Sequence, residues 1–281
     1  MKFTKMHGCG NDYVYVDCFK EKVENPGELA IKVSDRHFGV GSDGLILIKP
    51  SDIADFRMAM YNADGSEGMM CGNGIRCVAK FVYDKGLTDK TQLSIETKSG
   101  IKYLDLQVED GKMISATVDM GEVKVEEPVV VKAVKDHPIT LNKLATNPAT
   151  NAGADEIELV SVNVGNPHAI MFIESTKEAP VESVGKVIEK DPAFPEGVNV
   201  EFIELIDRDT INMRVWERGS GETFACGTGA CASAVAGISR GYLNDSVTVH
   251  LLGGDLSIRY DKETKHVFMT GPATIVFEGE L

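Results

Sequence analysis

Residues 71–76 read CGNGIR and residues 226–231 read CGTGAC, so the pattern Cys-Gly-x-Gly occurs twice, 155 residues apart (226 − 71). Sliding the sequence along itself by the same 155 residues brings Gly10-Asn11 onto Gly165-Asn166, and Tyr61 onto Trp216. A constant offset that holds over a long stretch is typical of an internal repeat. We infer an internal duplication, the alternative being two independent α/β units whose turns happen to follow a similar rhythm.

Each copy of the motif stands between strand-like segments and a helix-like one. Apolar, β-branched and aromatic residues in 45–48, 56–62 and 211–217 predict strands that end at glycine-rich turns. Residues 75–85 and 230–240 predict helices, because each segment has a cation in its last turn and is followed by glycine. We predict an α+β fold of two pseudo-symmetric β-rich halves, each wrapped around a central helix, with the active site in the cleft between them.

The repeat also predicts how the chain divides. We expect an N-terminal half over residues 1–124, which the C-terminal strand 270–281 rejoins, and a C-terminal half over residues 125–269. The stretch 122–152, which runs into the turn-forming sequence TNPATNAG (146–153), is expected to hold the crossing between the halves.

Composition narrows the class of function. The 281 residues, 43% of them apolar, suffice for substantial cores. A net charge of −14 without a basic cluster disfavours nucleic acid and anionic membranes as partners, so we expect a small-molecule ligand. No segment resembles a signal peptide or a membrane span, and six cysteines are too few for a disulfide scaffold. We expect a cytoplasmic protein with reduced thiols.

A cysteine at the start of a helix can do acid–base chemistry. The first amide N–H groups of a helix lack partners within it, and the helix dipole adds partial positive charge there. Both effects are expected to lower the thiol pKa of Cys71 and Cys226, while the glycines let amides approach a substrate carboxylate. Two such bases on opposite sides of one carbon could remove its proton from one face and return one to the other. The pattern favours a racemase or epimerase.

Other roles for the cysteines stay open. A buried, inert thiol is the ordinary state of this residue, and we expect it for the four remaining cysteines, Cys9, Cys18, Cys77 and Cys231. Zinc binding is disfavoured because no CxxC occurs and the paired cysteines of each motif would lie on different faces of a helix. A redox pair is a further alternative, whose disulfide we would interpret as an inactivated form.

Six stretches of the sequence together resemble the diaminopimelate epimerase family. They are HGCGNDYVYVD (7–17), CGNGIRC (71–77), GNPHAI (165–170), GVNVEF (197–202), WERGSGET (216–223) and ACGTGAC (225–231). The resemblance implies an isomerase that interconverts LL- and meso-2,6-diaminopimelate on the route to lysine and peptidoglycan precursors. It also implies that no pyridoxal phosphate, other cofactor or metal is used, and that the protein is a homodimer.

The resemblance assigns roles to individual residues. Cys71 would deprotonate the LL form and Cys226 the meso form, with His168 and Glu217 assisting proton transfer. The remaining positions would bind substrate: Asn11, Asn62, Gly72, Asn73, Asn166, Asn199, Glu217, Arg218, Gly227 and Thr228. Arg218 is suited to the distal carboxylate, which its guanidinium can bind through two hydrogen bonds. Some family members have a glutamine ligand where this chain has Gly44, so that contact cannot be transferred.

Several of these residues also have a purely structural interpretation. Asn11, Asn62 and Asn199 stand near turns, where asparagine often bonds to its own backbone. His168 precedes an apolar strand and could be a satisfied core histidine, and Glu217-Arg218 could be a solvated pair.

Two other classes of function remain as alternatives. One is another cofactor-independent racemase or isomerase, acting on proline, hydroxyproline or histidine. The other is a redox-active or ligand-binding thiol protein without catalytic activity.

Overall fold

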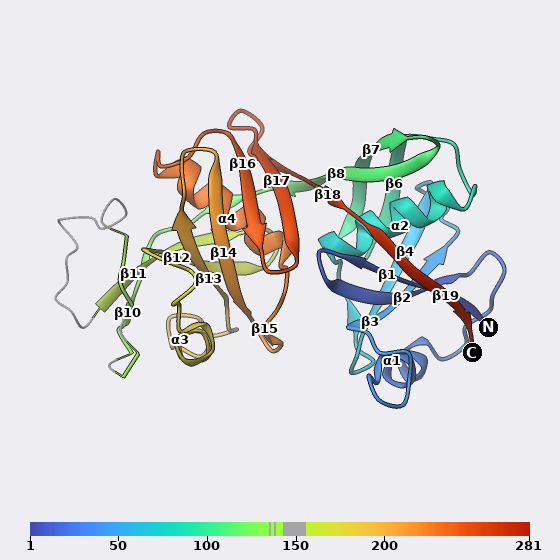
Figure 1. The fold of residues 1–281 in the computed structure, drawn as a ribbon, viewed down its shortest axis with the longest axis horizontal. Helices are drawn as coiled ribbons and strands as arrows, with labels where there is room; N and C mark the ends of the chain where they lie inside the picture. Colours follow the sequence, from blue (N-terminus) through green and yellow to red (C-terminus); the bar gives the residue numbers. More distant parts are fainter. Residues whose placement is uncertain (135, 138, 143–155) are drawn as a thin grey trace. The chain divides into compact units, whose positions relative to one another are not determined.

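The computed structural model describes residues 1–134, 136–137, 139–142 and 156–281 of a chain built from two compact units. Unit 1 comprises Met1–Asp119 and Thr270–Leu281, and unit 2 comprises Met120–Met269 (Figure 1). Both units are rich in strands, which confirms the predicted α+β class with two β-rich halves. The turn sequence TNPATNAG lies outside the described residues.

Unit 1 has one sheet whose neighbouring strands follow the order β19, β1, β2, β3, β4, β6, β7 and β8. The pairs β2–β3 and β4–β6 are parallel and the others antiparallel. β3 is an unbroken apolar run, as expected of a strand buried between two neighbours. The elements are β1 (Lys2–Gly8), β2 (Asn11–Asp17), α1 (Pro26–Ser34), β3 (Gly44–Lys49), β4 (Phe56–Asn62), β5 (Glu67–Gly68), α2 (Gly72–Asp84), β6 (Gln92–Thr97), β7 (Gly100–Glu109), β8 (Lys112–Glu122) and β19 (Thr274–Glu280).

Unit 2 repeats this arrangement with strands β10, β11, β12, β13, β14, β16 and β17. Here β12–β13 and β14–β16 are the parallel pairs. The chain passes between the units through β8 and β18, each of which has residues in both. The elements are β9 (Lys124–Val125), β10 (Val129–Lys132), β11 (Glu156–Asn163), β12 (Pro167–Ile173), α3 (Val181–Ile188), β13 (Asn199–Leu205), β14 (Thr210–Glu217), β15 (Gly221–Glu222), α4 (Gly227–Ser239), β16 (Ser246–Leu251), β17 (Gly254–Tyr260) and β18 (His266–Pro272).

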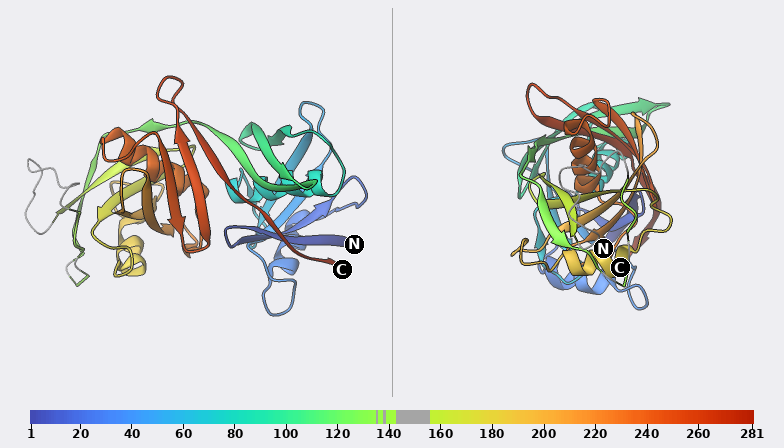
Figure 2. Two further views of the ribbon diagram at one scale, coloured as in Figure 1. Left: turned by 45° about the horizontal axis from the view of Figure 1, so that its top comes forward. Right: turned by 90° about the vertical axis from the view of Figure 1, so that its left-hand side faces the viewer.

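The central helices α2 and α4 begin three residues before the predicted segments, directly after Cys71 and Cys226. The predicted cations, Lys85 and Arg240, are the C-terminal caps rather than members of the last turn. In α4 nearly every side chain is small and buried, so strands of unit 2 can close around it (Figure 2). A helix without a polar face is stable only in such a buried position.

The offset of 155 residues recurs in the secondary structure. Helix α2 spans Gly72–Asp84 and α4 spans Gly227–Ser239, which is the same range moved by 155. The strand registers follow the same offset, because Tyr13 pairs with Gly44 in unit 1 and His168 pairs with Asn199 in unit 2. Equivalent positions of the two halves therefore occupy equivalent places in their own sheets.

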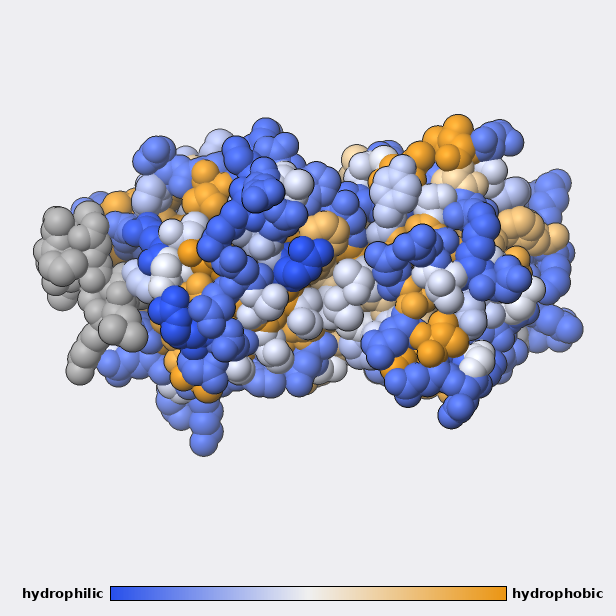
Figure 3. Space-filling model, turned by 90° about the horizontal axis from the view of Figure 1, so that it is seen from above, coloured by the Kyte–Doolittle hydropathy of each residue, from blue (hydrophilic) through white to orange (hydrophobic). Residues whose placement is uncertain are grey.

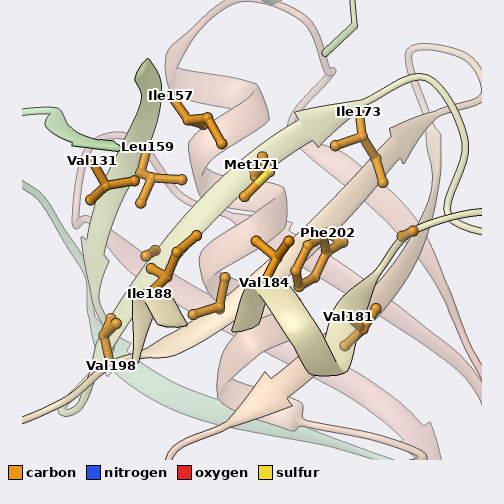
Figure 4. Close-up of a cluster of buried hydrophobic side chains, with 13 residues drawn as sticks. Val131, Ile157, Leu159, Met171, Ile173, Val181, Val184, Ile188, Val198 and Phe202 are labelled. Atoms are coloured by element: carbon orange, nitrogen blue, oxygen red, sulfur yellow. The ribbon is translucent and has the colours of Figure 1, made fainter. Parts of the chain in front are cut away.

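A second helix in each unit packs on its sheet. In unit 2, Val184 and Ile188 of α3 gather with Met171 of β12 and Phe202 of β13 in one cluster of buried side chains (Figure 4). Each such side chain contributes about 1.5–3 kcal/mol when it is fully buried. This cluster fixes β12 and β13, which carry candidate site residues.

One face of the molecule is mainly polar (Figure 3). The face shown in Figure 3 is largely hydrophilic, and its hydrophobic side chains occur in small separate groups. Among the described residues, no helix combines the length and apolar character that a membrane span requires.

Candidate active site

The two cysteines of the repeated motif cap equivalent helices. Cys71 and Cys226 both have extended backbone, and their Sγ atoms accept the N–H of Gly74 at 3.3 Å and of Gly229 at 3.4 Å. A Cβ added at Gly74 or Gly229 would lie 2.7 Å from a neighbouring side-chain atom, so these glycines leave room beneath the helix start. Each thiol is thus held at the first turn of its helix.

In unit 1 the thiol of Cys71 belongs to a polar network. Its Sγ–H donates to Asn11 Oδ1 at 3.0 Å, and Asn11 Nδ2–H donates to Asp43 Oδ2 at 2.7 Å. Asn73 Nδ2 lies 3.5 Å from the same Asn11 oxygen. Burial and the nearby charge of Asp12 raise the pKa of Asp43. Three sequence-predicted residues, Cys71, Asn11 and Asn73, therefore meet in this unit.

Asn62 and Gly44 are paired in register on neighbouring strands of unit 1. The Asn62 amide donates to the Ser66 hydroxyl at 3.0 Å across the turn after β4, so its partner is a side chain and not the backbone that the structural interpretation predicts. A Cβ at Gly44 would lie 2.1 Å from the carbonyl oxygen of Tyr61. The absence of a side chain at position 44 is therefore a requirement of this sheet.

In unit 2 the equivalent region contains a buried histidine and a buried glutamate. His168 Nδ1 lies 2.6 Å from Glu201 Oε1, and both side chains are fully buried. His168 Nε2 lies 3.0 Å from Asn166 Oδ1, and Asn166 Nδ2 lies 3.4 Å from Thr228 Oγ1. Thr228 Oγ1 in turn lies 3.5 Å from the Sγ of Cys226. A chain of polar contacts thus runs from Glu201 to the second cysteine.

Glu201 is a residue that the sequence analysis missed. The signal in the sequence was a glutamate within the apolar strand sequence NVEFIEL. The 155-residue offset makes this glutamate equivalent to Ile46 in the first half. His168 takes the equivalent position of Tyr13 under the same offset. The two halves therefore differ in chemical character at both of these positions.

The expected low pKa is wrong for Cys226. Burial raises the thiol pKa of Cys226 well above its ordinary value, and the charges of Glu217 and Glu201 act in the same direction. These effects raise the pKa more than the position at the helix start and the hydrogen bond from the Gly229 N–H lower it. Burial also raises the pKa of Glu217, whose Oε1 accepts a hydrogen bond from the Thr223 hydroxyl.

Asn199 and Arg218 form a further group in unit 2. The Oδ1 of Asn199 accepts the backbone N–H of Arg218 at 2.9 Å. The Arg218 guanidinium is exposed and donates to the carbonyl oxygen of Glu196 at 2.9 Å. Among the described residues it has no carboxylate partner within salt-bridge distance. This cation is available to an anionic ligand.

All six cysteines are free thiols in the structure. Four of them, including Cys77 and Cys231, are buried, whereas Cys18 and Cys71 are partly exposed. Within the described ranges, no group of three or more His, Cys, Asp and Glu side chains is arranged to hold a metal ion.

Solved structures share this fold at low sequence identity. A phenazine biosynthesis protein of the PhzF family from Bacillus anthracis has a TM-score of 0.76 and 18% identity, covering 100% of this chain and 98% of its own. A probable proline racemase from Agrobacterium radiobacter has a TM-score of 0.69 and 14% identity, covering 100% and 92%. At such identities the similarity establishes the two-part fold alone.

The sequence comparisons are closer. The diaminopimelate epimerase family model matches residues 3–126 and 160–276. Proteins named diaminopimelate epimerase from Agathobacter rectalis and Methanococcus maripaludis strain C5 are 55% and 53% identical, each covering 100% of this chain and 99% of its own. The Bacillus subtilis protein of that name is 49% identical over 99% of this chain and 97% of its own. These matches extend over both units, and the chain therefore belongs to the diaminopimelate epimerase family.

Proposed function

We propose that this protein is an isomerase that interconverts LL- and meso-2,6-diaminopimelate, a step of lysine biosynthesis. The observation that carries the proposal is the pair of cysteines, Cys71 and Cys226, that cap equivalent helices in a chain of this family. Relatives at about 50% identity over the whole chain bear the name diaminopimelate epimerase. No step of the proposed reaction requires a cofactor.

In the proposed mechanism, the two cysteines act on one carbon from opposite faces. Cys71, as thiolate, removes the α-proton of the LL form, and Cys226, as thiol, donates a proton to the other face; the reverse reaction exchanges the roles. The raised pKa of Cys226 suits it to begin as the acid in the LL-to-meso direction. This scheme requires a ligand site shared by the two units, which is part of the proposal.

The helix starts would bind the carboxylate at the reacting centre. The proposed donors are the amides of Gly72, Asn73, Gly227 and Thr228, because the first turn of a helix carries N–H groups and partial positive charge. As the α-proton leaves, negative charge spreads onto that carboxylate, and fixed amide dipoles stabilise it. His168 and Glu217 would assist the transfer of protons to and from the cysteines.

In this proposal, other residues bind the end of diaminopimelate that does not react. Arg218 would bind the distal carboxylate, and its exposed guanidinium lacks a carboxylate partner among the described residues. The proposed amide ligands are Asn11, Asn62, Asn166 and Asn199. Because only one centre is inverted, these groups need not be mirrored between the halves.

Three broader features also remain proposals. The common offset of the helices and strand registers supports an internal duplication, with residues 270–281 returning to the first half. The boundary that the sequence predicts after residue 124 lies five residues beyond Asp119, the end of the first segment of unit 1. We propose a cytoplasmic homodimer, an assembly that membership of the family suggests.

Exchange of solvent deuterium into diaminopimelate tests the function directly. Under reducing conditions we expect deuterium at an α-carbon and conversion between the LL and meso forms. Exchange into proline, hydroxyproline or histidine, with none into diaminopimelate, would instead support another racemase. No exchange into any of these substrates would favour a non-catalytic thiol protein.

A further inference from the structure

Glu201 is a fully buried acidic residue to which the proposed mechanism gives no role. It lies on β13, and its Oε1 lies 2.6 Å from Nδ1 of His168 on the neighbouring strand β12. Its other oxygen, Oε2, is buried and has no hydrogen-bond partner among the described residues. A buried carboxylate with an unsatisfied oxygen reduces stability, so the position needs an explanation other than packing.

Unit 1 shows how the same place can be filled without that penalty. A Cβ at Gly74 would lie 2.7 Å from Cδ1 of Ile46, and a Cβ at Gly229 would lie 2.7 Å from Oε1 of Glu201. The carboxylate in unit 2 therefore replaces an aliphatic side chain beneath the equivalent helix start. The histidine likewise takes the position of Tyr13. Because Glu201 and His168 contact each other, unit 2 differs from unit 1 by a contacting pair and not by two separate polar residues.

The contacts of His168 define what the pair can do. An ionised carboxylate only accepts hydrogen bonds, so Nδ1 must carry a proton to bond to Glu201. The other nitrogen, Nε2, lies 3.0 Å from Oδ1 of Asn166, which only accepts, so this contact is a hydrogen bond when Nε2 also carries a proton. The amide nitrogen of Asn166 reaches Thr228 and through it the Cys226 thiol. Nε2 is thus the ring nitrogen left to exchange a proton on the side of the second cysteine.

We propose that Glu201 is a positioning residue that acts through His168. It holds the ring with Nδ1 protonated, and its negative charge balances the imidazolium that forms when Nε2 takes up a proton. When Nε2 returns that proton, the ring reverts to the neutral form with Nδ1–H. This inference rests on the proposed function only for its kinetic consequence, because the state of the ring can be measured without substrate.

The first test is a side-chain ¹H–¹⁵N spectrum of the substrate-free protein at pH 8. Titratable groups of three elements face His168 or its contacts: Glu201 on β13, Glu217 on β14 and Cys226 at the start of α4. We expect His168 to bear a proton on Nδ1, whereas free histidine favours Nε2. Glu201→Gln should shift the Nδ1 resonance, and Glu204→Gln on the same strand should not, because Glu204 bonds to Thr176 instead. A wild-type ring protonated on Nε2 alone would overturn the proposal, even if the variant failed to fold.

The second test measures kinetics with diaminopimelate. For Glu201→Gln we expect kcat to fall about 10- to 100-fold, the loss of activity typical when the hydrogen-bond partner of a metal-ligating histidine is removed, while KM changes less than about threefold. If Glu201 acts through His168, the double variant with His168→Gln should be no slower than His168→Gln alone. Additive losses, or unchanged kcat for Glu201→Gln, would refute the proposal. Failure of the wild type to act on diaminopimelate would refute the proposed function and leave the spectroscopic test in force.

Discussion

The carboxylate of Asp43 fixes the orientation of the Asn11 amide: Oδ2 of Asp43 accepts the Nδ2–H of Asn11 at 2.7 Å. Because an ionised carboxylate cannot donate, the amide nitrogen must face Asp43, and its carbonyl oxygen must face Cys71. That oxygen lies 3.0 Å from the Cys71 Sγ. Asp43 in turn bonds to the Arg36 guanidinium at 2.8 Å. The partly exposed ion pair between Asp43 and Arg36 thus determines which atom of the Asn11 amide faces the Cys71 thiol.

Replacement of Asp43 by asparagine should lower activity without loss of the fold. The new amide can donate as well as accept, so Asn11 can turn and present its nitrogen to the thiol. We expect kcat for diaminopimelate to fall about tenfold. The melting temperature should change by only a few degrees, because burial already disfavours the charged form of Asp43. An unchanged kcat with an unchanged melting temperature would argue against this role for Asp43.

Alanine at either capping cysteine should abolish epimerisation. Each substitution removes one of the two proposed bases, and we expect kcat to fall by at least about 10³-fold in Cys71→Ala and in Cys226→Ala. Cys231→Ala is the matched control, because this thiol is buried in α4, outside the polar contacts described for Cys226. Polarimetry or chiral chromatography of the products measures the rate. Substantial activity in either of the first two variants is incompatible with the two-base scheme.

Arg218→Gln should weaken substrate binding. The loss of a charge-assisted hydrogen bond costs about 1.5–3 kcal/mol, which corresponds to a rise in KM of about 10- to 100-fold. Stability should hardly change, because the guanidinium is exposed. Arg208→Gln serves as the control, since this exposed arginine bonds to Asn244 outside the proposed site. Equal KM values for the two variants would exclude Arg218 as the ligand of the distal carboxylate.

The stability of the protein should decrease in alkali partly through Cys77. Burial raises the pKa of this thiol from 9.0 to about 12. Between these values the folded protein retains a proton that the unfolded chain loses, so this contribution is complete below pH 9 and lost as the pH rises to about 12. Its size is about 4 kcal/mol. Urea unfolding of Cys77→Ala should give lower stability at pH 7 but a flatter decline between pH 9 and 11. If the free energy of unfolding fell equally steeply with pH in the wild type and in Cys77→Ala, the alkaline loss of stability would not come from Cys77.

Position 44 should not tolerate a side chain. A Cβ there would lie 2.1 Å from the Tyr61 carbonyl oxygen, and we expect Gly44→Ala to lower the free energy of unfolding by about 1–3 kcal/mol. Gly111→Ala is a control that introduces backbone strain without a collision. Gly111 has a φ of +73°, but no atom lies within 4 Å of the added Cβ. That control should cost about 1 kcal/mol. A smaller loss for Gly44→Ala than for Gly111→Ala would show that the sheet can adjust.

The sequence predicted much of the architecture because its signals are local. A Cys-Gly-x-Gly start, a glycine after the last turn and runs of β-branched residues each act within a few positions, and they located α2, α4 and several strands. The offset then related the two halves. These features do not depend on which distant segments come together.

Properties that depend on distant segments escaped prediction. Glu201 and His168 are 33 residues apart and meet only because β12 and β13 pair in parallel. The expected low pKa of Cys226 was wrong because helix geometry is visible in the sequence, whereas burial and nearby carboxylates are not. The roles assigned to Asn62 and Arg218 from the family remain predictions.

The unequal burial of the two capping thiols sets an order of chemical vulnerability. Cys226 is 5% exposed at the start of an almost wholly enclosed helix, whereas Cys71 is partly open to solvent. An electrophile that enters from solution will therefore alkylate Cys71 first, and Cys226 must wait for a local opening of unit 2. Treatment with a slow alkylating reagent, followed by peptide mass mapping, should therefore show modification of Cys71 before modification of Cys226.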